Sequence, residues 1–412
     1  MEPIYTSCCG LDVHKKSIQA CVRRIGKDGK VQQEIRPFGT MTRDIAALAD
    51  WLSDEEVTHV AMESTGIYWK PVYNILEGRF TILLVNARHV KNVPGRKTDV
   101  KDCQWIAQLL QCGLLKGSFV PDRSQRELRD LTRHRSKLVD QRSSVVNRVH
   151  KVLEDANIKL GAVASDVVGK SGMDMIRALV EGWQDSSDMA DLARGKLRGK
   201  IPQLRLGLEG HVTNHHRFML GQLLDQLDYL DRQIDQFSQR IEEVSRPFVE
   251  AIKEVARLPG LQKLASENVI AEIGCNMDQF PSADHLCSWA GICSGNNESA
   301  GKRKSGKTTK GSKWLRAALV QAAWAASRKK DSYFHAQYGR LAGRRGKKRA
   351  AIAVAHSLLV VIYHVLKNHT EYKDLGRDYF DKLNSRRLVP YLVKRLKNIG
   401  YEVNLVPIES AG

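Results

Sequence analysis

Apolar residues recur every three or four positions over residues 220–244, and this repeat restricts the possible folds more than any other feature of the chain. The repeating positions are Leu220, Leu223, Leu227, Leu230, Ile234, Phe237, Ile241 and Val244. A seam of this period predicts one long helix that must be buried against another helix. A weaker repeat over residues 128–152, interrupted by Arg135 and Arg142, supplies a candidate partner. The two helices can pair within one chain or between subunits, and the sequence leaves both arrangements open.

The first 112 residues predict a different architecture, in which strands and helices alternate. Strand-like segments at 5–13, 18–25 and 30–38 are separated by short turns, which favours a meander. Helical segments near 43–52, 69–76 and 99–112 then alternate with apolar strands at 57–62 and 80–85. This order of elements is that of an α/β fold of the ribonuclease H-like (RuvC-like) type.

Beyond residue 250 the pattern is helical, and we expect an all-α C-terminal domain. The turn Leu258-Pro259-Gly260-Leu261 before a helical stretch at 264–273 resembles a helix-hairpin-helix element, whose glycine turn presents N–H groups to a phosphate. A loop rich in glycine and lysine follows at 291–311, then helices at 313–327 and after residue 347. We therefore expect an α/β domain at 1–122, a helical coiled-coil region at 123–250 with an unassigned insert at 159–207, and the all-α domain at 251–400.

Positive charge is concentrated in one part of the chain. The formal net charge is +19, and residues 300–350 alone contain sixteen Lys or Arg and one acidic residue. An excess of this size predicts a polyanionic partner such as DNA or RNA. The residues expected to contact nucleic acid are Gly260, Lys302, Arg303, Lys304, Lys307, Lys310 and Lys313. The alternative is a solvated basic loop that binds any nucleic acid weakly.

Other classes of protein are disfavoured by the composition. No uninterrupted apolar run reaches the roughly 18 residues of a membrane span, and residues 350–366 read as a buried helix. The N-terminus has no basic segment followed by an apolar one, so we expect no secretory signal. The eight cysteines show neither zinc-ligand spacing nor a disulfide framework. We expect a cytoplasmic protein with reduced thiols and no membrane partner.

Four carboxylates lie at the ends of expected elements. Asp12 is near the end of the first strand, Glu63 ends the fourth strand, and Asp99 and Asp102 are three residues apart at the start of a helix. If the four converge, two divalent cations would relieve their repulsion and polarise a phosphate. Oxygen ligands without His or Cys favour Mg²⁺ or Mn²⁺ over zinc. For Asp99 or Asp102 alone, the simpler interpretation is a charge that complements the helix dipole.

These residues belong to motifs that resemble a known family. Gly-Leu-Asp-Val-His-Lys at 10–15, Glu-Ser-Thr-Gly-Ile-Tyr at 63–68 and Lys-Thr-Asp-Val-Lys-Asp at 97–102 resemble the DEDD transposases of the insertion-sequence family numbered one hundred and ten. The run from Trp-Ala-Gly-Ile at 289–292 through Glu-Ser at 298–299 to Lys-Gly-Ser at 310–312 resembles the same family. The resemblance covers both ends of the chain.

The resemblance implies a RuvC-like DEDD domain, a coiled coil and a C-terminal transposase domain with a nucleophilic serine. It also implies donor and target DNA, a structured guide (bridge) RNA, and a homo-oligomer, dimer or tetramer. A nucleoid-associated location in a prokaryotic cell is implied as well. By motif, the catalytic acids are Asp12, Glu63, Asp99 and Asp102, and the nucleophile is Ser299. From the residues alone, Ser294, Ser305 and Ser312 lie in the same loop and are alternatives.

Three classes of function fit these features. The first is a DNA recombinase that cleaves and rejoins strands by Mg²⁺-dependent transesterification through a covalent phosphoserine link. The second is a junction-resolving nuclease in which a metal-activated water attacks and Ser299 has no chemical role. The third is an architectural nucleic-acid-binding protein. A stable protein–DNA adduct would support the first class, and clean hydrolysis the second. Metal-independent binding without cleavage would support the third.

Overall fold

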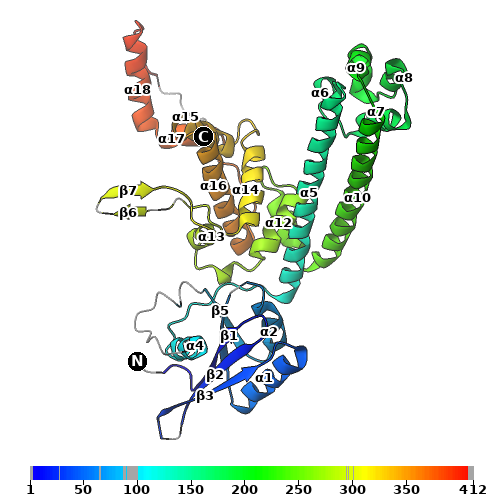
Figure 1. Cartoon of the computed structure of the whole chain (residues 1–412). Helices are drawn as coiled ribbons and strands as arrows, with labels where there is room; N and C mark the ends of the chain where they lie inside the picture. The colour runs from blue at the N-terminus through cyan, green and yellow to red at the C-terminus, as the bar shows by residue number, and fades with distance from the viewer. Residues whose placement is uncertain are drawn as a thin grey trace. The chain divides into compact units, whose positions relative to one another are not determined.

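The computed structural model describes residues 3–26, 28–64, 66–86, 90, 101–293, 295, 297–299 and 301–406. The chain divides into two compact units, Met1–Pro121 and Asp122–Gly412. The first is a mixed α/β unit and the second is mainly helical (Figure 1).

The first unit is built on a five-stranded sheet of order β3-β2-β1-β4-β5. The strands are β1 (Ser7–Val13), β2 (Ile18–Ile25), β3 (Val31–Phe38), β4 (His59–Glu63) and β5 (Thr81–Val85). Strands β1, β2 and β3 are antiparallel neighbours, whereas β4 and β5 run parallel to β1. The meander and the later alternation of strands and helices therefore follow the order expected from the sequence.

Helices cover both faces of this sheet. Helices α1 (Thr42–Asp54) and α2 (Trp69–Leu76) pack on the face that carries Cys9, Leu11 and Val13. Helix α4 (Asp102–Gln111) packs on the opposite face, with Cys8 of β1 in its core. Successive strand residues point to opposite faces, so Asp12 lies on the face covered by α4. The expected start of this helix near Asp99 was wrong: Lys101 is extended and forms the N-cap, so the helix begins at Asp102.

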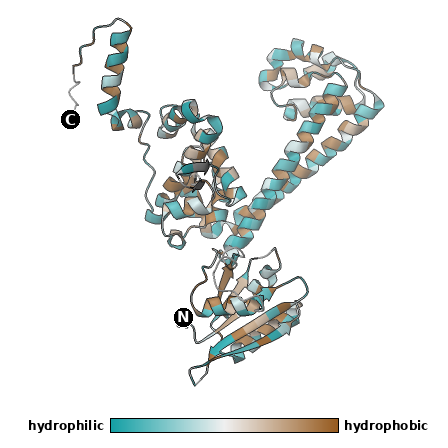
Figure 2. Cartoon of the chain, turned by 60° about the vertical axis from the view of Figure 1, so that its left-hand side comes forward, coloured by the Kyte–Doolittle hydropathy of each residue, from teal (hydrophilic) through white to brown (hydrophobic). Residues whose placement is uncertain are grey.

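Two long helices form a hairpin at the start of the second unit. Helices α5 (Arg123–Asp155) and α10 (Asn214–Val244) pack against each other within the chain (Figure 1). Leu227 and Leu230 of the repeat are buried, and Ile234 and Phe237 are partly buried. Hydrophobic and hydrophilic residues both occur along the length of these helices (Figure 2). Pairing within one chain, one of the two arrangements left open by the sequence, is the one observed.

Polar residues that interrupt the repeat are paired. Arg142 bonds to Asp231 of α10, and Arg135 forms an ion pair with Glu267 of α12 (Lys263–Ile273), with 2.8 Å between Nη1 and Oε2. The Arg135 and Glu267 side chains are 5% and 3% exposed. A charge buried to this extent is tolerated only with a partner, so these arginines fix the register of α5 on its neighbours.

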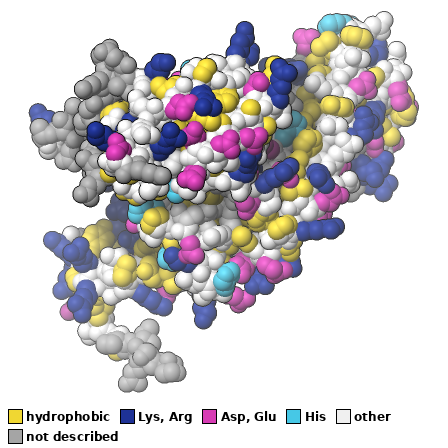
Figure 3. All heavy atoms as spheres, turned by 90° about the horizontal axis from the view of Figure 1, so that it is seen from below, with side chains coloured by type: hydrophobic (Ala, Val, Ile, Leu, Met, Phe, Trp, Pro, Cys, Tyr) yellow, Lys and Arg dark blue, Asp and Glu magenta, His cyan; other side chains and the backbone are white. Residues whose placement is uncertain are grey.

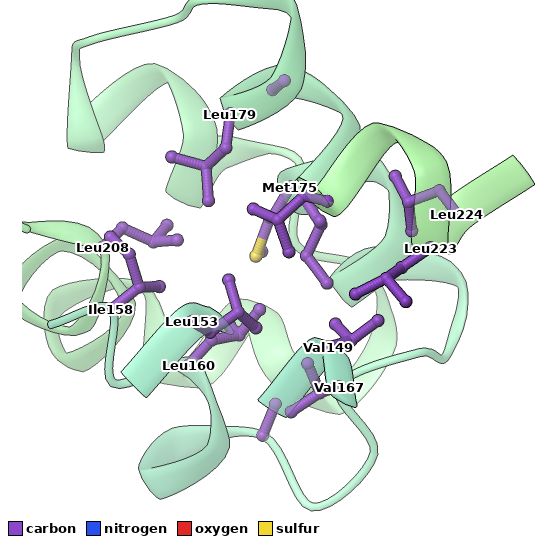
Figure 4. Close-up of a cluster of buried hydrophobic side chains, with 14 of the residues drawn as sticks. Val149, Leu153, Ile158, Leu160, Val167, Met175, Leu179, Leu208, Leu223 and Leu224 are labelled. Carbon is purple, nitrogen blue, oxygen red and sulfur yellow. The ribbon is translucent and has the colours of Figure 1, made fainter. Parts of the chain in front are cut away.

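The insert between the long helices, which could not be assigned from the sequence, is a cap of short helices. It contains α6 (Leu160–Val163), α7 (Lys170–Glu181), α8 (Ser186–Asp191), the 3-10 helix η1 (Gly195–Lys200) and α9 (Ile201–Leu208). Leu160, Met175, Leu179 and Leu208 meet Leu153 of α5 in one hydrophobic cluster (Figure 4). Apart from α7, which has 12 residues, these helices have eight residues or fewer and are too short to show a clear period in the sequence.

Over its described residues, the rest of the second unit is helical apart from one hairpin and the connecting loops. Its elements are η2 (Arg246–Phe248), α11 (Val249–Ala256), α12, η3 (Met277–Gln279), α13 (Ala283–Trp289), β6 (Asn297–Ser299), β7 (Lys302–Ser305), α14 (Lys313–Ala326), α15 (Tyr333–Arg345), α16 (Lys347–Asn368), α17 (Tyr379–Leu383) and α18 (Ser385–Asn398). The expectation of an all-α domain was wrong at β6 and β7, because short lysine-rich strands lack the apolar alternation that predicts a strand.

Helix α16 is the core helix of this region. It is the one helix within the described ranges that is long and apolar enough to cross a membrane, and 56% of its apolar window is buried inside the protein. Val354, Leu358 and Ile362 are fully buried, and the helix packs against α13, α14 and α15. This environment agrees with the buried helix expected from the sequence.

The hairpin of α5 and α10 gives a first testable prediction. Leu227→Asp together with Ile234→Asp should lower the stability of the protein by at least about 3 kcal/mol, because two charges would be placed in an apolar contact. Thermal unfolding measures the effect. Tyr229→Asp, at a position 53% exposed on the same helix, is the matched control and should change little. Equal melting temperatures for the wild type and both variants would contradict the burial of this seam.

Candidate active site

Asp12 and Glu63 are brought together by the pairing of two parallel strands. Strand β1 pairs with β4 in a register that joins Leu11 to Met62, and Asp12 and Glu63 are the next residues of the two strands. Leu11 and Met62 belong to the core on the α1 and α2 face. Because side chains alternate along a strand, both carboxylates lie on the α4 face of the sheet.

Gly10 determines how closely α4 approaches these carboxylates. A Cβ atom at Gly10 would lie 2.4 Å from both the backbone nitrogen of Ala107 and the backbone oxygen of Cys103. No side chain larger than hydrogen fits there, so the glycine allows the α4 backbone to rest directly on β1. Asp102, the first residue of α4, is thereby carried toward the end of β1 where Asp12 lies. Gly10 was not among the residues predicted from the sequence to matter, although a glycine inside an apolar strand is a signal of close backbone approach.

Electrostatics place three of the four acids in one region. The pKa of Asp12 is raised, first by burial and then by the negative charges of Asp102 and Glu63, while His14 lowers it. The His14 Nε2 atom lies 3.1 Å from Asp12 Oδ2. A raised pKa of this origin means that the ionised Asp12 is poorly compensated by the protein alone. A divalent cation would supply that compensation.

The fourth acid, Asp99, lies outside the described residues. Within the ranges that the structure describes, no group of three His, Cys, Asp or Glu side chains is arranged closely enough to hold a metal ion. The donor chemistry of Asp12, Glu63 and Asp102 fits a hard cation, since all three offer carboxylate oxygens. Their donor chemistry therefore suits a divalent metal, whereas the described side chains do not by themselves form a metal site.

Ser299 lies at the tip of the β6–β7 hairpin, which extends from the helices of the second unit (Figure 1). Its backbone pairs with Lys302, and Gly301 has a φ of 71°, the left-handed conformation that tight hairpin turns require. Ser294 lies outside the described residues, as do the side chains of Ser299, Arg303 and Lys304.

The two other candidate serines have local partners. The hydroxyl of Ser305 accepts a hydrogen bond from the Lys307 backbone. Ser312 caps α14 by accepting from the Leu315 N–H, and it donates to Glu272 Oε2 at 2.9 Å. These bonds give both serines structural roles.

The residues expected to bind nucleic acid divide into two groups. Lys302, Lys307, Lys310 and Lys313 lie on β7 or between it and the start of α14. Gly260 lies in the turn between α11 and α12, where a Cβ would be 2.1 Å from the Ala322 carbonyl oxygen of α14. Helix packing alone therefore explains this glycine, and its binding to a phosphate remains a prediction.

Comparison with known proteins now connects both units to one family. A family model described as a transposase, of the DEDD type found in IS110 elements, matches residues 9–158. A second, described as the transposase IS116/IS110/IS902 family, matches residues 252–339. The chain is 23% identical over 380 residues, or 88% of its length, to the transposase for insertion sequence element IS1111A from Coxiella burnetii, of which 90% is covered. With the two matches together spanning more than half of the sequence, the chain belongs to the IS110 family of insertion-sequence transposases, enzymes that recombine DNA.

Proposed function

We propose that this transposase cleaves and rejoins DNA by transesterification, with Ser299 as the nucleophile and a metal site formed by Asp12, Glu63, Asp99 and Asp102. The observation that carries the proposal is the position of Glu63 and Asp102 beside Asp12, whose pKa is raised first by burial and then by these two charges, while His14 lowers it. Carboxylates that repel one another when no metal is bound are suited to hold a cation. In support of a ribonuclease H-like fold, the sheet has the order β3-β2-β1-β4-β5 with an antiparallel meander.

In this reaction the Ser299 Oγ attacks the phosphorus of a DNA phosphodiester and loses its proton. A bond from phosphorus to a deoxyribose oxygen breaks, and that oxygen leaves as a strand-end hydroxyl. A second strand end attacks the serine-linked phosphate in the reverse step, so no net hydrolysis occurs. Bound Mg²⁺ or Mn²⁺ would polarise the phosphate and stabilise the attacking and leaving oxygens. The carboxylates of Asp12, Glu63, Asp99 and Asp102 would hold the ion, and Ser299 would supply the attacking hydroxyl.

The partners follow from the same proposal. The basic segment at 300–350 would bind a structured guide RNA as well as donor and target DNA, in a homo-oligomeric assembly within the cytoplasm. Phosphate contacts are expected from Lys302, Arg303, Lys304, Lys307, Lys310, Lys313 and the turn at Gly260. We further propose three functional parts, at residues 1–122, 123–250 and 251–400. RNA that co-purifies with the protein and is encoded beside its gene would support this assignment.

Replacing the nucleophile tests the mechanism. Ser299→Ala should eliminate the covalent protein–DNA adduct seen on denaturing gels with end-labelled substrate, because no other hydroxyl takes its place at the hairpin tip. Ser305→Ala, at the end of the same hairpin, should retain the adduct. An undiminished adduct in Ser299→Ala would move the nucleophile elsewhere. Hydrolysed strands without any adduct in the wild-type protein would favour the metal-activated water of a junction-resolving nuclease.

A further inference from the structure

A cavity of about 1290 Å³ lies in the second unit, where the end of strand β7 meets the helices α14, α15 and α16. One wall is formed by residues 305–308, just after the hairpin that carries Ser299. The opposite wall is one face of α16, on which lining residues recur every fourth position from Lys348 through Ile352 to His356. The volume slightly exceeds the range of about 300–1,000 Å³ typical of small-molecule sites.

The cavity is lined by cations and by no acid. Its five charged side chains are Lys307, Arg316, Arg345, Lys348 and Arg349. In the described part of the chain, none of the five forms an ion pair with a carboxylate. On the molecular face seen in Figure 3, by contrast, Lys and Arg are interspersed with Asp and Glu. Five converging cations without counter-charge raise the local potential and favour an anionic ligand.

The first turn of α16 adds to this preference. The helix has 22 residues and begins after Gly346, which offers no side-chain cap, and its first three residues are Lys347, Lys348 and Arg349. Cations are unfavourable at a helix N-terminus, where the dipole and free N–H groups favour an anion. A phosphate bound at this end of the cavity would be stabilised by both the N–H groups and the side chains.

Gln337 provides a different kind of group at the same cavity. Its Nε2 atom donates to the Ser357 hydroxyl at 2.8 Å, while its Oε1 atom is buried and has no hydrogen-bond partner among the described groups. A buried acceptor without a donor is unfavourable. Nucleobases carry amino and imino donors that would satisfy it, and Ile352 and Ala353 supply apolar surface in the same lining.

We propose that this cavity binds one unpaired nucleotide of a nucleic-acid strand, with its phosphate at the start of α16 and its base edge at Gln337. This inference depends on the proposed function in one respect: a nucleic-acid strand must pass near the β6–β7 hairpin. An unpaired nucleotide is favoured over a paired one, because in a duplex the imino donor of a base is already bonded to the partner base and is not available to Gln337. DNA and RNA share this chemistry, so the source of the strand is an outcome of the test.

The test uses the full-length protein and fluorescence anisotropy with single-stranded DNA, single-stranded RNA and duplex DNA of one sequence. Arg345→Ala with Arg349→Ala should weaken single-strand binding at least about tenfold and reduce the salt slope by about 0.7 for each phosphate that is no longer neutralised. Gln337→Leu should weaken single-strand binding without changing the salt slope. Duplex binding should change less in both variants. The strand type with the larger loss of affinity identifies the source.

The matched control is Lys329→Ala with Lys330→Ala, which removes the same charge from exposed positions of the same unit outside the cavity. If this control loses as much single-strand affinity as the cavity variant, the effect is one of overall charge and the proposal is overturned. Equal losses for duplex and single strands would overturn it as well. Adduct formation through Ser299 is measured separately on the same proteins, so a failed cavity and a failed nucleophile give different results.

Discussion

Asp12→Asn is expected to abolish strand cleavage and, without divalent metal, to make the protein more stable than the wild type. A bound metal ion stabilises the charge of the transition state by several kcal/mol. Because each 1.4 kcal/mol changes the rate about tenfold, we expect the cleavage rate to fall by about 10³-fold or more. The pKa of Asp12 is raised in the folded protein, first by burial and then by Asp102 and Glu63. At neutral pH the ionised carboxylate therefore opposes folding, and an amide removes that penalty.

The sign of the pH dependence follows from the same shift. A carboxyl whose pKa is higher in the folded than in the unfolded chain contributes stability below its unfolded value, and that stability is lost as the pH rises through the folded value. Wild-type protein in a chelator should show this loss, and Asp12→Asn should not. Adding Mg²⁺ should raise the melting temperature of the wild type but not of Asp12→Asn, by ligand binding to the folded state. Asp54→Asn, an exposed acid of α1 in the same unit, is the control. Cleavage by Asp12→Asn at the wild-type rate would disprove the metal site.

Glu272→Gln is expected to lower the stability of the protein by about 3–5 kcal/mol, a large loss for a single substitution. The Glu272 side chain is 3% exposed and bonds to Arg133 through both oxygens, at 2.6 and 2.9 Å. Arg129 lies 4.0 Å away and is so buried that its pKa falls to about 10. Removing the carboxylate charge takes away the acceptor of both Arg133 bonds and the negative charge nearest to the buried Arg129.

Urea unfolding of the full-length protein measures this effect. Glu250→Gln removes an acid that is 81% exposed and pairs with Lys253, so it should change stability by no more than about 0.5 kcal/mol. The Glu272 variant should also loosen the start of α14, because Ser312 donates to Glu272. Unfolding midpoints that coincide for the two variants would show that the buried network does not hold α5 on α12.

The features that the sequence predicted well are those in which a repeating pattern decides the structure. The apolar repeat at 220–244 has the period of a helix and falls within helix α10. The apolar segments predicted as strands at 57–62 and 80–85 fall on β4 and β5. The association of Asp12 with Glu63 also followed, since parallel neighbouring strands end at the same edge of a sheet. In each case the information lies within one element or in the order of elements.

The features that the sequence did not predict depend on contacts between distant segments. Nothing near Gly10 in the chain indicates that Cys103 and Ala107 will rest on it. The close packing of Gly260 against the much later helix α14 was likewise not indicated by its neighbours in the sequence. The cavity at α16 draws on Lys307, Arg316 and Gln337 from three separate segments, and a count of charges along the chain cannot show which of them converge.

The cap at the end of the α5–α10 hairpin has a consequence for how the chain folds. The two long helices are joined only through the residues from 156 to 213, and a chain segment of that length is entropically costly to close when it is unstructured. The cap has its own cluster of buried side chains, including Met175 and Leu208. Once it is formed, the end of α5 and the start of α10 are held near each other, and the seam can close progressively from that end. The insert therefore reduces the entropic cost of pairing the two long helices.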